Sequence, residues 1–337
     1  MSDWRTFLAG RGARLDAGGV AGFGDAQAEA IAARDATIVA DLSHNALLAV
    51  SGDDAAAFLH GQLTNDVQAL VAGGAQWTGW CSAKGRLLAT FLLLRRANDF
   101  LLLLPAEIAP GIAKRLRMYV LRSRVKIEDA PLERIALAGP GAVELAARHF
   151  GVAPGPMASV EKDGATCIAL DAKRFVILAP LERERALWDA FAQQARPVGM
   201  DAWEWTSIRA GIPIVGARTQ EQFVPQMANF ELVGGVSFKK GCYPGQEIVA
   251  RTQYRGILKK RMAMAHVDGA RPAPGDTLHT PAFGEQAAGM VVSAAPSPDG
   301  GHDLLAVAQI EGIQSGDLRV GSLAGERLRL LPLPYST

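Results

Sequence analysis

Long apolar runs bounded by polar residues form the clearest pattern along this chain. Residues 79–95 read GWCSAKGRLLATFLLLR and residues 100–105 read FLLLLP, with a predicted turn at 96–99 (RAND) between them. Continuous apolar runs of this length are typical of buried strands that are joined by tight turns. The pattern therefore predicts an antiparallel unit with one tight turn at Ala83-Lys84-Gly85.

Helical spacing replaces this pattern further along the chain. Apolar residues at 108, 112, 116, 119 and 120 fall on one helical face, which predicts a helix over 106–122, and a strand over 123–129 follows it. The order strand, strand, strand, helix, strand indicates an α+β fold and not a doubly wound sheet.

The segment before the apolar unit predicts two short strands and a capped helix. Two apolar runs split by polar residues occupy 37–51, and residues 52–67 have the composition of a helix. Asp53 or Asp54 is the expected N-cap, because a carboxylate there accepts a hydrogen bond from a free amide of the first turn.

The second half of the chain predicts another α+β lobe and a separate β domain. Residues 135–151 predict a strand, a turn and a helix, and strands at 166–171 and 174–180 precede a helix at 181–195. After residue 260 the apolar runs become short and are separated by Gly and Pro, which favours a small antiparallel barrel or sandwich. We therefore expect a region 1–256 and a C-terminal domain 257–337.

Charge narrows the possible partners. The 337 residues carry a formal net charge of +1, so a nucleic-acid contact would need a local patch. One basic cluster lies between residues 239 and 261 and holds Lys or Arg at 239, 240, 251, 255, 259, 260 and 261, against the single acid Glu247. A second cluster comprises Lys114, Arg115, Arg117, Arg122, Arg124 and Lys126. Each cluster is compatible with a solvated face or with a nucleic-acid contact.

The most apolar region does not predict a membrane span. Charged residues at 95, 96 and 99 interrupt it before it reaches the ~20 apolar residues that a membrane-spanning helix needs. We therefore expect no membrane partner.

The three cysteines, Cys81, Cys167 and Cys242, lie far apart and follow no secretory signal, so we expect reduced thiols and a cytoplasmic location. No histidine or cysteine pair has metal-ligand spacing, so no metal site is predicted. Cys81 and Cys167 stand in apolar runs and are expected in the core.

Cys242 has different neighbours. Lys239 and Lys240 precede it, and nearby cations favour the thiolate, which is the nucleophilic form. Gly241 and Gly245 let the main chain take unusual angles or approach a ligand closely. From the residues alone, a functional thiol and a buried structural cysteine both remain open. For Trp203 and Trp205, the pattern alone favours packing in the core.

Residues 240–247 read KGCYPGQE and resemble, nearly residue for residue, the K-G-C-Y-x-G-Q-E signature of the YgfZ family of folate-binding proteins. The resemblance runs from about residue 37 to the end of the chain. Further matching stretches are 61–67 (GQLTNDV), 81–85 (CSAKG), 209–213 (RAGIP), 222–226 (QFVPQ), Asn229, 234–239 (GGVSFK), 249–251 (VAR), 255–256 (RG) and 331–336 (LPLPYS).

This family is related to the aminomethyltransferase, or T-protein, of the glycine cleavage system. The resemblance implies a ring of two interwoven α+β lobes, one of them ferredoxin-like, and a C-terminal antiparallel β-barrel. It implies tetrahydrofolate or a derivative in the central opening. It also implies upkeep of iron-sulfur enzymes, including those that methylthiolate tRNA, so that folate and iron-sulfur enzymes or assembly factors are the expected partners.

The resemblance also implies roles for single residues. Cys242 is expected to be the functional thiol, with Lys239, Lys240 and Arg251 holding an anionic neighbour. Trp203 matches a tryptophan that lines the folate pocket of relatives. The remaining expected folate contacts are Gln226, Asn229, Tyr243, Gln246 and Glu247.

The chain also departs from its relatives. Ala89-Thr90 stands where aminomethyltransferases carry an acidic pair, Arg209 replaces a common Glu, and Asn45 replaces an expected aromatic wall. The leading hypothesis is therefore a folate-binding accessory protein for iron-sulfur enzymes and tRNA modification, and not a self-sufficient enzyme. The alternatives are a folate-dependent one-carbon (aminomethyl) transferase, and direct tRNA contact through the basic segment 239–261.

Overall fold

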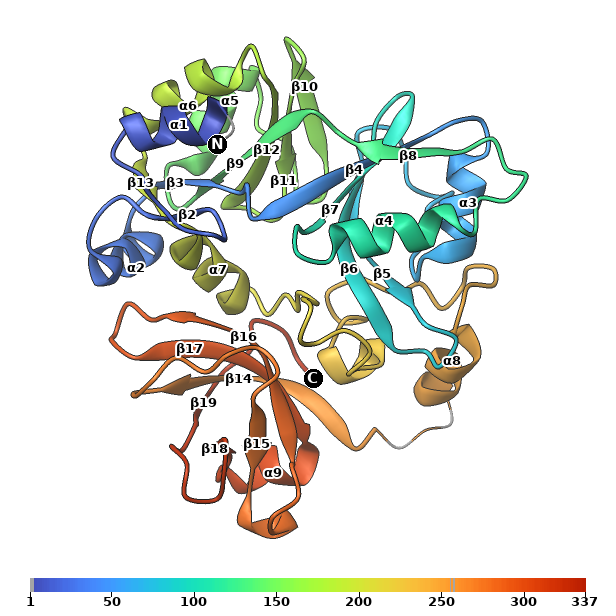
Figure 1. Ribbon diagram of the computed structural model, residues 1–337, viewed down its shortest axis with the longest axis vertical. Coiled ribbons are helices and arrows are strands. Elements are labelled where there is room, and N and C mark those ends of the chain that lie inside the picture. The colour runs from blue at the N-terminus through green and yellow to red at the C-terminus, as the bar shows by residue number, and fades with distance from the viewer. Residues whose placement is uncertain (1–2, 255, 257) are drawn as a thin grey trace.

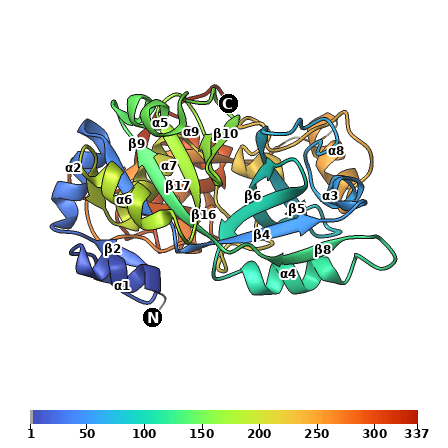
Figure 2. The ribbon, with the colours of Figure 1, turned by 90° about the horizontal axis from the view of Figure 1, so that it is seen from above.

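The computed structural model describes residues 3–254, 256 and 258–337. Three lobes, each built on one large β-sheet, surround the C-terminal tail (Figure 1). The first two lobes lie next to each other when the molecule is seen from above (Figure 2). The α+β content expected from the sequence is confirmed.

The first lobe holds a six-stranded sheet in the order β10-β11-β12-β9-β3-β13. Its strands are β3 (Ile38–Asp41), β9 (Leu132–Ala138), β10 (Ser159–Lys162), β11 (Ala165–Ala169), β12 (Arg174–Pro180) and β13 (Arg196–Val198). One face packs against α1 (Asp3–Gly10), α5 (Ala142–Phe150) and α6 (Glu184–Ala192). The same lobe carries the hairpin of β1 (Arg14–Leu15) and β2 (Val20–Gly22), and the helix α2 (Ala26–Asp35).

The second lobe is ferredoxin-like. Its antiparallel sheet has the order β5-β6-β7-β4-β8. The elements are β4 (Asn45–Ser51), α3 (Ala55–Gln62), β5 (Ala75–Cys81), β6 (Leu87–Arg95), β7 (Asp99–Pro105), α4 (Ala109–Arg117) and β8 (Lys126–Asp129). Without the edge strand β5, this is a β-α-β-β-α-β unit in which β7 separates β4 from β6. Both helices pack into one hydrophobic cluster on one face of the sheet.

The antiparallel unit predicted from the apolar runs is confirmed. β5 pairs with β6 and β6 pairs with β7, so the continuous apolar runs are strands that are buried on both faces. The turn at 83–85 is closed by a 2.8 Å hydrogen bond from the amide of Gly85 to the carbonyl oxygen of Ser82. Gly85 has φ +69°, a left-handed angle that glycine adopts without a steric penalty.

Two details of the predicted helices are wrong. Asp54 is the N-cap residue of α3, but its carboxylate makes no capping bond and accepts a 2.7 Å hydrogen bond from the amide of Arg124. The helix predicted over 106–122 ends at Arg117. Apolar spacing continues past its end because Tyr119 packs edge-on against Trp80, which a periodic pattern cannot distinguish from another helical turn.

The two α+β lobes are interwoven along the chain, as the resemblance implies. After β3 the chain builds the whole second sheet before it returns to the first sheet at β9. β13 then pairs in parallel with β3, Arg196 facing Ile38 and Val198 facing Ala40. The first sheet therefore depends on segments from both sides of the second lobe.

A connecting region leads from the first lobe to the third. It contains α7 (Met200–Arg209), the short 3-10 turn Pro225–Ala228 and α8 (Gln246–Tyr254). α8 begins inside the KGCYPGQE stretch, at Gln246.

The third lobe is a curled antiparallel sheet, a half-barrel, in the order β18-β15-β16-β17-β14-β19. Its elements are β14 (Lys260–Val267), β15 (Thr277–His279), the 3-10 turn Pro281–Phe283, β16 (Gly289–Pro296), β17 (His302–Gln309), α9 (Ile310–Ser315), β18 (Arg319–Val320) and β19 (Arg329–Leu331). The expected domain boundary between 256 and 257 falls at residue 257, which is outside the described residues.

Candidate functional site

Cys242 lies in the loop before α8, and its side chain is exposed. Cys81 in β5 and Cys167 in β11 are buried, as predicted, and burial raises the pKa of each thiol to about 12. At neutral pH both buried cysteines therefore stay protonated and shielded from solvent. Among the cysteines, only Cys242 is placed to react or to contact a partner.

The loop around Cys242 is fastened by Lys240. Its ammonium donates hydrogen bonds to the main-chain carbonyls of His60 and, at 2.5 Å, Leu63, at the C-terminal end of α3. A cation is stabilised there by the negative end of the helix dipole. The Lys240 side chain is buried, which lowers its pKa to about 8 even though Asp66 and Cys242 act to raise it.

Two further contacts hold the loop. The Tyr243 ring is buried and lies 4.8 Å from the Lys240 ammonium. Gly245 has φ +78°, and a Cβ on it would lie 2.4 Å from the carbonyl oxygen of Ser82 and 2.6 Å from the Cα of Gly85. The glycine therefore permits close approach, and what approaches is the 83–85 turn of this chain. Cys242 is an exposed thiol on an anchored loop.

His60 and Asp66 are also close to this loop, and the sequence reasoning assigned neither a role. A Cβ on Gly241 would lie 3.6 Å from Nε2 of His60, and Nδ1 of His60 lies 3.2 Å from Oδ1 of Asp66. The stretch 61–67, which resembles the family sequence, contains Asp66 and could have indicated this residue. No three His, Cys, Asp or Glu side chains of the described residues converge in a way that could hold a metal ion.

The remaining predicted residues of the loop and α8 differ in exposure. Lys239, Glu247 and Arg251 are exposed. Gln246 is half-buried, and its amide donates a 3.3 Å hydrogen bond to the carbonyl oxygen of Gly241. Lys239, Cys242, Glu247 and Arg251 are therefore available to solvent, whereas Gln246 supports the loop. Arg255, part of the predicted basic segment, is outside the described residues.

Gln226 and Asn229 are buried and join the connecting region to its neighbours. The Gln226 amide donates to the carbonyl oxygen of Val249 in α8 at 2.8 Å. The Asn229 amide donates to the carbonyl oxygen of Met262 in β14 at 2.9 Å, and its Oδ1 accepts from the amide of Met262 at 3.3 Å. Both side chains have protein partners, and their contact with folate stays a prediction.

Trp203 and Trp205 in α7 are buried in the central hydrophobic cluster, as the pattern alone favoured. Nε1 of Trp205 donates a 2.8 Å hydrogen bond to Asp303 of β17. The Arg209 guanidinium lies 5.9 Å from the centre of the Trp205 ring. Arg209 and Asn45 are the two residues that differ from those expected in the folate pocket of relatives. Arg209 is the last residue of α7, and Asn45 is the first residue of β4.

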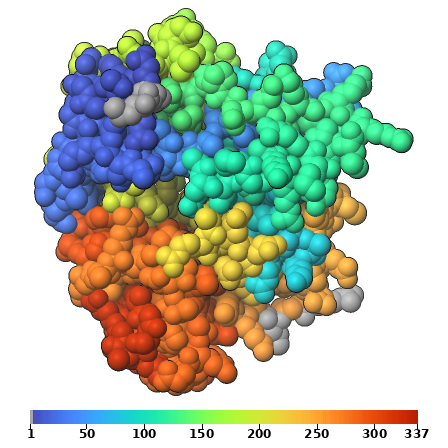
Figure 3. Space-filling model, in the orientation of Figure 1, coloured from blue at the N-terminus to red at the C-terminus, as the bar shows by residue number. Residues whose placement is uncertain are grey.

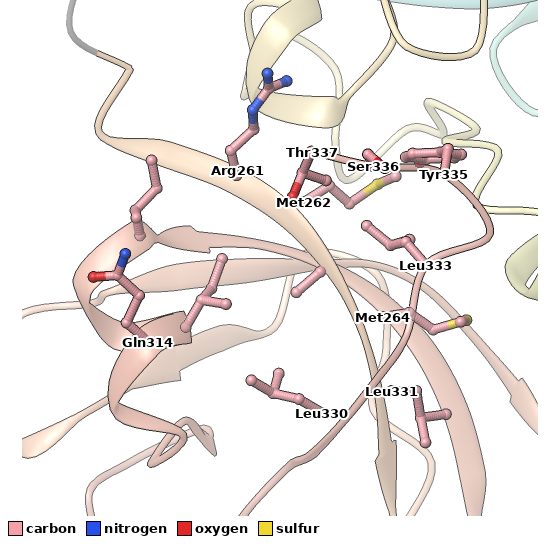
Figure 4. Close-up of a pocket in the computed structure, with 13 residues that line it drawn as sticks. Arg261, Met262, Met264, Gln314, Leu330, Leu331, Leu333, Tyr335, Ser336 and Thr337 are labelled. Carbon is pink, nitrogen blue, oxygen red and sulfur yellow. The ribbon is translucent and has the colours of Figure 1, made fainter.

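A cavity of about 530 Å³ lies between β14, α9 and the C-terminal tail (Figure 4). Apolar side chains dominate its wall, including Met262, Leu331 and Leu333, and Tyr335 closes one side. The hydroxyl of Tyr335 donates a 2.7 Å hydrogen bond to the carbonyl oxygen of Gly211. Asn229, a predicted folate contact, is hydrogen-bonded to the carbonyl oxygen of Met262, which lines the cavity. This bond connects the cavity to the predicted folate contacts.

The position of the missing carboxylate is buried in β6. Thr90 is fully buried, and its hydroxyl oxygen accepts a 3.0 Å hydrogen bond from the amide of Val215. Ala89 beside it is also buried. These two positions offer no acid or base.

The model of the GCVT N-terminal domain matches residues 21–240. The chain is 32% identical over 307 residues to the tRNA-modifying protein YgfZ of Cronobacter sakazakii, covering 86% of this chain and 91% of that protein. It is 31% identical over 298 residues to the tRNA-modifying protein YgfZ of Serratia proteamaculans, covering 86% and 90%.

A solved structure, the aminomethyltransferase T of the glycine cleavage system from Bartonella henselae, shares the fold with a TM-score of 0.82. The two sequences are 19% identical, and the match covers 98% of this chain and 96% of that one. The fold and the family expected from the KGCYPGQE stretch are therefore confirmed. This chain belongs to the YgfZ family and carries a GCVT N-terminal domain over residues 21–240.

Proposed function

We propose that this protein binds tetrahydrofolate or a derivative and acts as an accessory protein for iron-sulfur enzymes, and thereby for the methylthiolation of tRNA. The relatives named tRNA-modifying protein YgfZ support the tRNA role, and the GCVT domain fits a folate. Both the modified tRNA and the reduced thiols fit a cytoplasmic location. No helix in the described part of the chain is long and apolar enough to cross a membrane.

One observation carries the proposal: Cys242 is exposed on a loop whose neighbours Lys240 and Tyr243 are buried. An anchored loop presents a thiol to a partner without the entropic cost of ordering it. Lys239 and Arg251 are exposed, and they offer positive charge to an anionic partner. Lys240 contributes by holding the loop in place.

Folate is assigned to the central region, where Trp203, Gln226 and Asn229 lie. The chain has buried hydrogen-bonding side chains there, and the nearby cavity has apolar walls for a flat ring. Tyr243, Gln246 and Glu247 belong to the Cys242 loop and the start of α8, so they would connect a bound folate to the thiol. A bound folate would supply a one-carbon unit or act as a regulator.

The aminomethyl transferase alternative is less well supported. Thr90 and Ala89 leave no carboxylate at the position of the acidic pair in that class. Purified protein mixed with 5,10-methylenetetrahydrofolate and amine acceptors is therefore expected to show no turnover. Measurable turnover would favour the transferase over the accessory role.

The accessory role is tested by measuring 2-methylthioadenosine in tRNA from a strain that lacks the gene. The wild-type gene is expected to restore the nucleoside, and a Cys242→Ala variant is expected to restore much less at equal protein level. Ser322→Ala, which changes an exposed residue of the third lobe, is the matched control and is expected to restore it fully. Full restoration by Cys242→Ala would remove the thiol from the function.

Folate binding is tested separately on the pure protein by calorimetric titration with tetrahydrofolate and by thermal unfolding. A ligand at a hundred times its Kd raises the free energy of unfolding by about 2.7 kcal/mol. Trp203→Phe is expected to weaken binding, whereas Trp188→Phe in the core of the first lobe is not. No heat and no stabilisation would exclude the folate while leaving the tRNA result untouched.

A further inference from the structure

The loop between α4 and β8 forms a basic projection on the second lobe. Figures 1 and 3 show this loop projecting from the right edge of the molecule. Residues 108–126 contain six Lys or Arg and no Asp or Glu. We call this surface the α4 patch: it consists of Lys114, Arg115, Met118, Tyr119, Leu121 and Arg122, all exposed.

Three cations of the α4 patch have no acidic partner. Within the described residues, Lys114, Arg115 and Arg122 form no ion pair, whereas Arg124 pairs with Asp53 at 2.9 Å. Two further cations beside the patch are used by the protein itself: Lys126 pairs with Glu128 and Arg117 donates to the carbonyl oxygen of Ile127. Asp53, Asp54 and Glu128 are thus already paired with Arg124 and Lys126, and the charges of Lys114, Arg115 and Arg122 are exposed.

The α4 patch also exposes apolar side chains next to these cations. Leu121 is 88% exposed, Met118 is 68% exposed and Tyr119 is 44% exposed. Leu121 has φ +46°, a left-handed angle that a residue with a Cβ rarely adopts. An open hollow of about 630 Å³ is lined by Leu121, Arg122, Ser123 and Asp54, whose carboxylate accepts a hydrogen bond from the amide of Arg124. Large exposed apolar side chains that adjoin unpaired cations indicate a contact surface.

Helix α4 and helix α8, which follows the Cys242 loop, pack on opposite faces of the second sheet. Leu116 of α4 belongs to the core cluster on one face of the second sheet, and Val249 of α8 belongs to the cluster on the other. Figure 2 shows α4 and α8 on opposite sides of that sheet. A partner held by the α4 patch therefore approaches the sheet from the side away from α8.

We propose that the α4 patch is a docking surface for tRNA, in which Lys114, Arg115 and Arg122 contact backbone phosphates and Leu121 packs against an unpaired base. This inference rests on the proposed function, and it assigns the RNA contact to this patch and not to the segment 239–261. In that segment Lys240 is buried and Arg261 is bound to Glu231, Gln226 and Asn229, so two of its cations are unavailable.

RNA fits the α4 patch better than an anionic membrane does. Guanidinium groups match phosphate oxygens in a two-bond geometry, and unstacked RNA bases pack on apolar and aromatic side chains. Membrane-surface helices instead bury a long apolar face, whereas α4 turns its apolar face, Ile112 and Leu116, into the protein core. Three exposed side chains are too few to replace such a face.

The test is fluorescence anisotropy of labelled unfractionated tRNA with the full chain at 50–200 mM KCl. Wild-type affinity is expected to fall with salt, because each phosphate contact adds about −0.7 to −0.9 to the log-log slope. Lys114→Gln with Arg122→Gln is expected to make the slope shallower by about 1.5 and to weaken binding at 50 mM about tenfold. Leu121→Ser is expected to weaken binding about threefold to tenfold without changing the slope.

Matched controls separate this patch from general charge. Lys162→Gln with Lys173→Gln removes two exposed cations from the first lobe and is expected to change neither affinity nor slope. Thermal unfolding of each variant verifies its fold. The inference is overturned if tRNA does not bind, if Lys239→Gln with Arg251→Gln abolishes binding while the α4 variants keep it, or if the α4 variants lose binding only to vesicles with anionic phospholipid.

Failure of this inference is distinguishable from failure of the proposed function. A strain that loses 2-methylthioadenosine without the gene, together with a pure protein that never binds tRNA, overturns the α4 patch alone, since the client enzyme then makes the RNA contact. Binding of tRNA by a protein whose loss leaves the nucleoside unchanged overturns the proposed function alone.

Discussion

The ammonium of Lys240 lies 4.8 Å from the centre of the Tyr243 ring, and these two buried residues bracket the exposed Cys242. The cation also reaches the carbonyl oxygens at the end of α3. A single lysine thus connects the thiol loop, an aromatic ring and a helix terminus. The exposure of Cys242 depends on contacts that its neighbours make.

Replacing Lys240 should loosen the thiol loop. Lys240→Met keeps the stem but leaves two carbonyl groups at the end of α3 without this donor, which costs about 1–3 kcal/mol of folding free energy. We expect a lower midpoint in urea and faster alkylation of Cys242 by iodoacetamide. Lys239→Met is the matched control and should leave the urea midpoint unchanged, because Lys239 is exposed. Equal midpoints for the two variants would contradict the anchoring role.

Lys240 should also give stability a specific pH dependence. Its pKa is about 8 in the folded protein against 10.5 for the free side chain, so between pH 8 and 10.5 the unfolded chain binds more protons. The free energy of unfolding of wild type should therefore rise relative to Lys240→Met across that window, by at most about 1.4 kcal/mol per pH unit. Urea titrations of both proteins at several pH values measure this difference, and parallel curves would count against it.

The three thiols should react very differently. With a neutral disulfide reagent at pH 8, the folded protein is expected to release the equivalent of one thiol quickly, from Cys242, because Cys81 and Cys167 are buried and their pKa is raised to about 12. All three should react in guanidinium chloride. Cys242→Ser should abolish the fast reaction, and a fast phase that survives in this variant would show that a buried thiol opens to solvent.

Asn229 should stabilise the junction between the connecting region and β14. Its side chain is buried, bonds both main-chain groups of Met262, and has φ +55°. Asn229→Gly loses the hydrogen bonds, but glycine adopts the positive φ freely. Asn229→Ala loses the hydrogen bonds and is also strained by the positive φ. We expect both variants to be destabilised, and the alanine variant by about 1 kcal/mol more. Chemical denaturation measures both, and equal losses would mean that the left-handed angle relaxes.

Local patterns determined much of the second lobe. The runs at 87–95 and 100–105 became β6 and β7, because a strand that is buried on both faces must be continuously apolar. The glycine turn at 83–85 was predicted for the same local reason. The end of α4 was not predicted correctly, because Tyr119 continues the helical spacing although it lies in a turn and contacts Trp80.

The first lobe was only partly predictable. β9, α5, β12 and α6 follow from their apolar runs, but α1 and α2 were not predicted. α2 is rich in alanine and buries Glu29, whose carboxylate accepts hydrogen bonds from the amides of Phe23, Gly24 and Gly199. A buried acid breaks the apolar pattern on which helix prediction depends, and its partners come from distant segments.

The sequence by itself determined the α+β class, the family and the identity of the thiol, because apolar runs and a long contiguous motif are local properties of the chain. Only the tertiary structure showed that Cys242 is exposed, whereas the Lys240 ammonium is hydrogen-bonded to carbonyl oxygens at the end of α3. It also showed that His60 and Asp66 lie beside the Cys242 loop. Charge next to a cysteine in sequence does not reveal where a lysine's ammonium will find its acceptors. Those acceptors lie about 180 positions away along the chain, and folding alone brings them together.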